Sequence, residues 1–109
     1  MIRIQLYKSG DDFLGFECKG HAGAGDGEYD LICNSVSVLT INTANAIESL
    51  TETAFSEEEK PEGGYLKVVL SSPKDHDAQL LMRAMVLGLE QIAGNYPDYI
   101  RIQKREVNP

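Results

Sequence analysis

The chain is poor in three features that assign proteins to common classes. Only two of its 109 residues are cysteines, ten basic side chains stand against 17 acidic ones, and no long apolar run occurs. Two cysteines make no disulfide framework, so we expect free thiols in a reducing, cytoplasmic compartment. The net charge of −7 repels phosphate backbones and anionic lipid, which argues against a direct nucleic-acid or membrane partner. No run approaches the roughly 18 residues of a membrane span, and the alternating residues 1–6 are unlike a signal peptide.

What the chain does contain is enough for one domain spanning residues 1–109. A hydrophobic content of 42% can form a single core without a structural metal or disulfides. We therefore expect no cofactor and no metal. An acidic protein of this kind suits a basic polypeptide partner.

Two alternating segments near the N-terminus predict a β-hairpin. Apolar and polar residues alternate in residues 2–7 and again in 14–18, which is the period of a strand with one buried face. Residues 8–12 between them are rich in turn formers. We expect the following side chains to face the core: Ile2, Ile4, Leu6, Leu14, Phe16 and Cys18.

A helix is predicted from residue 31 to about residue 54. Apolar side chains recur there at steps of three and four, and no glycine or proline interrupts the segment. Asp30 occupies the position of an N-cap, so that Cys33 falls in the first turn. Ser37 then lies one turn later on the same side. The buried face should comprise Ile32, Val36, Leu39, Thr43, Ile47, Leu50 and Ala54.

Three further strands are predicted in the second half of the chain. The glutamate-rich residues 55–64 predict a charged edge strand that closes in a loop, to which we assign no catalytic role. Residues 65–70 alternate and predict the next strand. Residues 99–103 predict a last short strand, and residues from 104 onward a frayed tail.

A second helix is predicted between the last two of these strands. Ser72 is a capping residue followed by Pro73 at the first helical position, with Asp75 three residues after the cap. Gly94-Asn95 and Pro97 should end the helix. The resulting order is β-β-α-β-β-α-β, with two apolar-faced helices on a largely antiparallel sheet. This order predicts an α+β fold, a two-layer sandwich.

The segment 20–37 concentrates the residues that could do chemistry. A thiol near a helix N-terminus meets unpaired backbone N–H groups and the positive end of the helix dipole, and both favour the thiolate. Cys33 could attack a carbonyl while His21 takes the thiol proton, with amides at the helix start stabilising the oxyanion. Asp30 could orient His21 or simply cap the helix, and Ser37 could hydrogen-bond near the thiol or be structurally neutral. The glycines between His21 and Cys33, expected to form a flexible loop, are Gly23, Gly25 and Gly27.

Two other kinds of site fit the segment less well. A phosphate-binding loop has glycines at a similar gap, but Asp26 stands where its lysine belongs, and nearby acids repel phosphate. A zinc ion could use Cys18, His21 and Cys33, but these residues lack the paired spacing of structural zinc fingers.

The segment resembles that of the ribosomal-processing cysteine protease family, also called Prp or YsxB-like. The matching residues are Gly20-His21-Ala22, the glycine loop and Asp30-Leu31-Ile32-Cys33-Asn34-Ser35-Val36-Ser37, and the resemblance covers essentially the whole chain. It implies an endopeptidase that removes a short N-terminal extension from a large-subunit ribosomal protein, number twenty-seven. The cut falls after an aromatic residue and before a small one. The resemblance also implies a homodimer, with His21 and Cys33 as the catalytic pair and Gly20, Asp30 and Ser37 as supporting residues.

A non-catalytic, ribosome-associated binding module is the alternative hypothesis. In it Cys33 is buried and His21 merely ends a strand. The two hypotheses differ in thiol reactivity, because a catalytic thiol is alkylated fast near neutral pH whereas a core cysteine is inert until the protein unfolds.

Overall fold

The computed structural model describes residues 1–20, 27–61 and 63–107, with residues 28–30 described by their backbone. Within these ranges the chain forms five strands and two helices in the order β-β-α-β-β-α-β, which confirms the predicted order. The strands are β1 (Ile2–Ser9), β2 (Asp12–Lys19), β3 (Phe55–Glu59), β4 (Tyr65–Leu70) and β5 (Ile100–Glu106). The helices are α1 (Gly27–Leu50) and α2 (His76–Asn95). No helix in the described part of the chain combines the length and apolarity needed to cross a bilayer.

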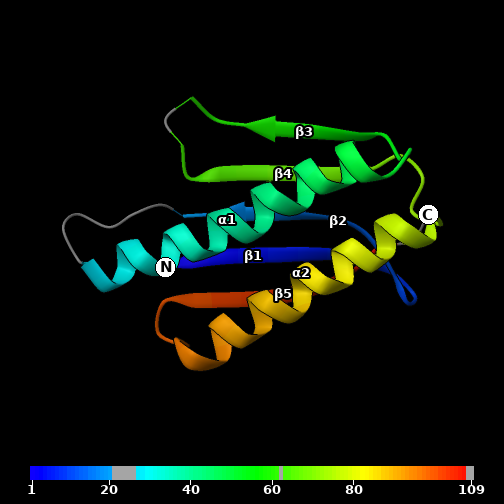
Figure 1. The fold of residues 1–109 in the computed structure, drawn as a ribbon. Helices are drawn as coiled ribbons and strands as arrows, with labels where there is room; N and C mark the ends of the chain where they lie inside the picture. The colour runs from blue at the N-terminus through cyan, green and yellow to red at the C-terminus, as the bar shows by residue number, and fades with distance from the viewer. Residues whose placement is uncertain (21–26, 62, 108–109) are drawn as a thin grey trace.

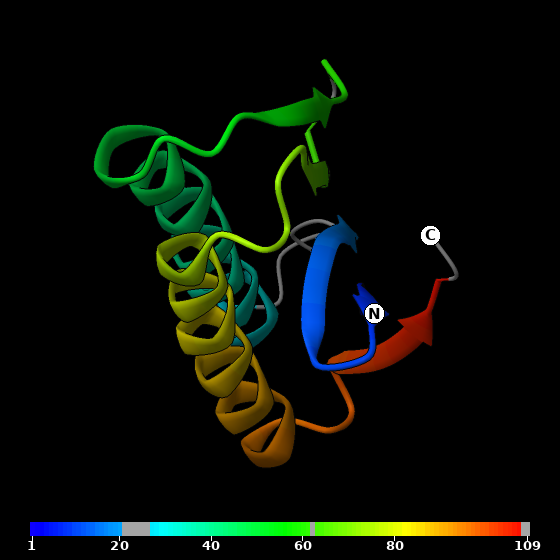
Figure 2. The same ribbon diagram turned by 90° about the vertical axis from the view of Figure 1, so that its right-hand side faces the viewer.

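One five-stranded sheet forms the layer behind the helices in Figure 1, in the order β3-β4-β2-β1-β5. Neighbouring strands are antiparallel except β1 and β5, which are parallel. Both helices cover the same face of this sheet, and the described residues place no helix on the other face (Figure 2). The fold is therefore α+β in two layers, as predicted.

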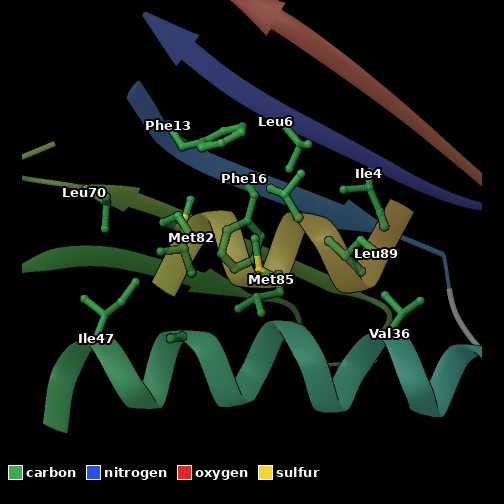
Figure 3. Close-up of a cluster of buried hydrophobic side chains, with 14 of the residues drawn as sticks. Ile4, Leu6, Phe13, Phe16, Val36, Ile47, Leu70, Met82, Met85 and Leu89 are labelled. Atoms are coloured by element: carbon green, nitrogen blue, oxygen red, sulfur yellow. The ribbon is translucent and has the colours of Figure 1, made fainter. Parts of the chain in front are cut away.

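The hydrophobic core fills the space between the sheet and the two helices (Figure 3). Alternate residues of the strands meet residues that recur every three or four positions on the helices. At the contact between the helices a Cβ on Gly88 would lie 2.9 Å from Cδ1 of Leu39, so this glycine permits their close approach. The core residues labelled in Figure 3 are Ile4, Leu6, Phe13, Phe16, Val36, Ile47, Leu70, Met82, Met85 and Leu89.

The buried side of β2 differs from the predicted alternation. Phe13 and Phe16 are buried, whereas Leu14 is only half-buried. The ladder between β1 and β2 shifts its register between Tyr7 and Lys8. This irregularity inserts an extra residue into β2 and changes which residues face the helices. The prediction that Leu14 faces the core was wrong for this reason.

Helix α1 ends at Leu50 rather than near Ala54. The side chain of Leu50 is 72% exposed and Ala54 is exposed. The prediction that these two residues belong to the buried face of the helix was therefore wrong. The Thr51 hydroxyl donates to the carbonyl of Ile47 at 2.7 Å, and the N–H of Thr53 donates to that hydroxyl at 3.1 Å. Such local side-chain bonds to the backbone compete with continuation of the helix and account for its end.

Asp75, and not Ser72, caps helix α2. The Asp75 carboxylate accepts hydrogen bonds from the N–H of Ala78 at 3.3 Å and from the Thr53 hydroxyl at 2.7 Å. Ser72 lies in the preceding turn, where its carbonyl accepts from the N–H of Asp75 at 3.2 Å. The hydrogen bond from Thr53 holds the pKa of the Asp75 carboxyl below its ordinary value. Both serine and aspartate are good capping residues, and the hydrogen bond from Thr53, a residue distant in the sequence, favours Asp75 over Ser72.

Strand β5 continues to Glu106, so the predicted frayed tail from residue 104 was wrong. Lys104 lies opposite Leu6 of β1 and Glu106 opposite Lys8. The N–H of Val107 also donates to the carbonyl of Lys8 at 2.7 Å. Pairing with a strand from the other end of the chain keeps these polar residues in the sheet.

Candidate active site

The structure places the two residues of the predicted catalytic pair differently. Cys33 lies in α1, half-buried, and packs against the hydrophobic core. His21 lies outside the described residues, as do Gly23 and Gly25 of the predicted loop. The elements on both sides of that segment are described, since β2 and Gly20 precede it and α1 follows it.

Cys33 lies in the second turn of α1 and not in its first turn. The helix begins at Gly27, so Gly27 is helical rather than part of the loop, and Asp30 lies in the first turn rather than at the N-cap. The influence of the helix dipole falls off within the first turn. Side chains of a helix lean toward its N-terminus, which directs Cys33 back toward that turn. The helix start therefore favours a Cys33 thiolate less strongly than predicted.

Gly20 determines how the chain leaves β2 toward His21. Its φ of +115° is in a region that favours glycine, and a Cβ there would lie 2.7 Å from the carbonyl oxygen of Met1. Its N–H donates to the carbonyl of Gly64 at 3.0 Å. A glycine is therefore required directly before His21, for both conformation and space.

A cavity of about 180 Å³ lies between the end of β2, helix α1 and the β3–β4 hairpin. Ser37 lines it one helical turn after Cys33, is exposed, and donates no hydrogen bond to another described residue. A hydroxyl in this position is available to a bound ligand. The residues that line the cavity are Cys18, Gly20, Ser37, Thr40, Ile41, Glu59, Lys60, Gly63, Gly64, Tyr65 and Leu66.

The β3–β4 hairpin is the wall of this cavity that sequence reasoning missed. Strand β3 is an exposed edge strand as predicted, but Glu59 and Lys60 line the cavity. The Tyr65 hydroxyl donates to Glu17 at 2.7 Å, which raises the pKa of Tyr65. The Lys60 ammonium lies 4.5 Å from the centroid of the Tyr65 ring. Gly63-Gly64 marked a turn in the sequence, but no local pattern shows that this turn returns to the end of β2.

Cys18 packs against the core, as predicted, and also lines the cavity. Burial, and secondarily the neighbouring Cys33, raises the pKa of Cys18 to about 11. The Cys18 thiol therefore stays protonated near neutral pH and is a poor nucleophile.

The zinc alternative depends on His21, which lies outside the described residues. Among the residues that are described, no group of three or more His, Cys, Asp or Glu side chains is placed to hold a metal ion. Cys33 itself does not line the cavity, but it lies one helical turn before Ser37, whose hydroxyl has no partner among the described residues and which lines the cavity together with Gly20. These are parts of a site for nucleophilic catalysis.

Comparison with known proteins identifies the class and then the family. A family model described as cysteine protease Prp matches residues 1–101. The chain is 30% identical over 107 residues to the ribosomal processing cysteine protease Prp of Bacillus subtilis strain 168, covering 94% of this chain and 96% of that one. It is 28% identical over 83 residues to the protein of that name from Staphylococcus aureus, covering 76% and 78%. The chain is therefore a cysteine protease. It belongs to the Prp family of ribosomal processing cysteine proteases.

Solved structures share the fold of this chain. The crystal structure of SMU.848 from Streptococcus mutans has a TM-score of 0.91 at 32% identity and covers 98% of this chain and 96% of that one. The S. aureus Prp in complex with a covalently linked product peptide has a TM-score of 0.88 at 24% identity, covering 96% and 100%. Membership of a cysteine protease family removes the support for a non-catalytic binding module.

Proposed function

We propose that this protein removes the short N-terminal extension of the large-subunit ribosomal protein number twenty-seven, cutting after an aromatic residue. Its membership of the Prp family supports the reaction class. Crystal structures of the S. aureus Prp with a substrate peptide and with a covalently linked product peptide support a peptide substrate. The observation that carries the proposal is the cavity, which is lined by Gly20, directly before His21, and by Ser37, one helical turn after Cys33.

Acylation is the first chemical step. His21 takes the proton of the Cys33 thiol, and the thiolate attacks the carbonyl carbon of the aromatic residue, forming a C–S bond and an oxyanion. The oxyanion collapses, the C–N bond breaks, and the leaving amine takes the proton from His21. The product left on the enzyme is a thioester of Cys33 with the N-terminal extension.

Hydrolysis of the thioester is the second step. His21 takes a proton from water, and the water oxygen attacks the thioester carbonyl. The C–S bond then breaks, the Cys33 thiolate takes the proton back from His21, and the extension leaves with a new carboxyl group that loses its proton to solvent. Because Cys33 lies in the second turn of α1, the helix dipole assists its ionisation less than a first-turn position would. We therefore assign most of the thiol activation to His21.

The supporting residues have roles that follow from their positions. Gly20 fixes the direction in which the chain enters His21. Ser37 offers its hydroxyl to the substrate backbone from the cavity wall. Asp30 lies in the first turn of α1. We assign to it the orientation of His21, since the family resemblance makes it a supporting residue.

We also propose a cytoplasmic homodimer. The two helices expose large apolar side chains, and apolar patches on soluble proteins mark interaction surfaces. Val38 of α1 is 59% exposed, and Leu80 and Leu87 of α2 are 54% and 67% exposed. Light scattering should give the mass of a dimer for the wild type and of a monomer for Leu87→Glu.

The test of the proteolytic function is cleavage of a peptide that spans an extended ribosomal-protein N-terminus, followed by mass spectrometry. Wild type should cut one aromatic–small bond, whereas Cys33→Ala and His21→Ala should lose about 10⁴-fold or more in rate. Ser37→Ala should lose much less, since it removes one hydrogen bond to substrate. A pure wild type that leaves the peptide intact would overturn the proposal.

Alkylation gives a second test that needs no substrate. The raised pKa of Cys18 predicts that iodoacetamide labels Cys33 alone in the folded protein near neutral pH. His21→Ala should slow this labelling, because it removes the base that activates the thiol. Labelling of Cys18 before Cys33 would contradict the assignment of the nucleophile.

A further inference from the structure

The uncovered face of the sheet carries an excess of positive charge in an otherwise acidic chain. Side chains alternate between the two faces along the regular part of the strands. Half of the chain's ten basic residues point to this face in that way, whereas only two acidic residues do, Glu17 and Glu58. The basic residues are Arg3, Lys19, Lys67, Arg101 and Arg105. Among the described residues of the strands, this face therefore carries more basic than acidic side chains.

Three of these cations stand side by side across three strands, and we name Lys19, Arg3 and Arg101 the cationic row. Arg3 lies opposite Lys19 in the β1–β2 pair and opposite Arg101 in the β1–β5 pair. Adjacent strands are about 4.8 Å apart, and like charges directly opposite each other destabilise a sheet. The fold by itself gains nothing from this arrangement.

Acidic neighbours offset little of this repulsion. Lys19 forms an ion pair with Glu17 at 3.8 Å, while Arg3 and Arg101 form none with any described residue. Both arginines are exposed on the face that no described helix covers (Figure 2). Their guanidinium groups are therefore open to an external anion, and a planar guanidinium is well suited to phosphate.

The row adjoins both the active site and an aromatic ring. Lys19 directly precedes Gly20 and His21, so the row lies at the active-site end of the sheet. Tyr65 of β4 lies opposite Lys19, whose ammonium is 6.0 Å from the centroid of its ring. Surfaces that bind single-stranded nucleic acid combine cations for the backbone with aromatic rings on which bases stack.

We propose that the cationic row binds the phosphate backbone of single-stranded RNA. The choice of RNA over an acidic polypeptide rests on the proposed function, because a ribosomal protein works in contact with RNA. The net charge of −7 does not prevent this contact, since salt screens charges beyond about 10 Å and leaves the local row to dominate. The protease then holds its substrate's RNA on one face of the sheet while cutting at the sheet's end.

Salt-dependent binding of a fluorescent single-stranded RNA, followed by anisotropy, tests the proposal. Three phosphate contacts predict that wild type binds about 20-fold more weakly at about 200 mM salt than at about 50 mM. The variant R3Q/R101Q keeps only Lys19 of the row, so its affinity should be lower and should fall only about 3-fold over this range. The control R83Q/K104Q makes the same charge change on helix α2 and on the helix side of β5, and should behave as wild type.

Peptide cleavage measured in parallel separates this proposal from the proposed function. A peptide without RNA should be cut equally by wild type, R3Q/R101Q and R83Q/K104Q. Failure of all three to cut it would refute the proteolytic function while leaving RNA binding to be judged by anisotropy. Absence of RNA binding by wild type, equal losses in both double variants, or binding of polyglutamate instead of RNA would each overturn the proposal.

Discussion

The two ends of the sheet are held together by different kinds of interaction. At the end where β1 turns into β2, the buried Gln79 of α2 accepts a hydrogen bond from the N–H of Phe13 at 2.8 Å. Its amide also donates to the carbonyls of Phe13 and Pro73, both at 2.7 Å. The Thr53–Asp75 hydrogen bond lies at the start of the same helix. Side chains thus cross-link turns, strand and helix at this end.

The active-site end has the Tyr65–Glu17 hydrogen bond of 2.7 Å and depends further on backbone geometry. The N–H of Gly20 donates to the carbonyl of Gly64, and the positive φ of Gly20 directs the chain out of β2. The hydroxyl of Ser37 in the cavity has no partner among the described residues. Among the described residues, the buried amide of Gln79 is hydrogen-bonded at one end, whereas the hydroxyl of Ser37 is left available at the other, as expected of a scaffold that presents a binding site.

Replacing Gly20 should affect both stability and activity, and it has the largest expected effect. Gly20→Ala puts a Cβ against the Met1 carbonyl at a positive φ, so it should lower the free energy of unfolding by about 2–4 kcal/mol. It should also reduce peptide cleavage beyond the loss of folded protein, because it displaces His21. Urea unfolding and cleavage of the same preparation measure the two effects.

Gly10→Ala is the matched control at the other end. Gly10 also has a positive φ, of 61°, but a Cβ there meets nothing within 4 Å. Only the backbone strain of about 1 kcal/mol should appear, with cleavage per folded molecule unchanged. Equal effects of the two substitutions would contradict the steric role of Gly20.

Removing the hydrogen bonds of Gln79 should affect stability alone. Gln79→Met leaves the N–H and carbonyl of Phe13 unpaired in a buried place and should lower the free energy of unfolding by about 2–3 kcal/mol. Cleavage by the remaining folded protein should be unchanged, since this end is remote from the cavity. Gln91→Met, at an exposed position of the same helix, should have little effect on either measurement. A loss of activity per folded molecule in Gln79→Met would show that the two ends are coupled.

The smallest expected effect is the pH dependence caused by Asp75. The Thr53 hydrogen bond lowers the pKa of Asp75 in the folded state below the ordinary 3.8. The carboxylate therefore contributes stability above the unfolded pKa, and this contribution is lost as the pH falls through the folded pKa. Asp75→Asn keeps a capping side chain without the charge, so wild type should melt roughly a few degrees higher near pH 6. The two melting temperatures should converge as the pH falls through the lowered pKa of Asp75 in the folded state.

Thr53→Val provides the check on this assignment. This substitution removes the hydrogen bond that is the largest cause of the lowered Asp75 pKa. In the Thr53→Val background, the difference in melting temperature between Asp75 and Asp75→Asn should therefore depend less on pH. An undiminished dependence in the Thr53→Val background would assign the effect to the helix cap instead.

Local sequence patterns were sufficient for the order of elements and for most of the core. Alternation identified the inward residues of β1, and steps of three and four identified the α1 face from Ile32 to Ile47. The strand–glycine–helix segment with His21 and Cys33 indicated thiol chemistry through its residue types and their spacing. These features depend on residues close together in the chain, whose periodicity and propensities are visible without tertiary contacts.

Tertiary contacts alone decided the remaining features. Thr53 selected Asp75 over Ser72 as the cap, and pairing with β1 extended β5 to Glu106. Because of the bulge in β2, Phe13 is buried in the core, whereas Leu14 is only half-buried. The β3–β4 hairpin lines the cavity because β4 pairs with β2, and Gly20, which also lines the cavity, directly follows β2. The sequence by itself determined the order of the elements and indicated thiol chemistry. Long-range pairing determined the register, the caps and the shape of the cavity, because the energies that decide these features come from contacts between distant segments.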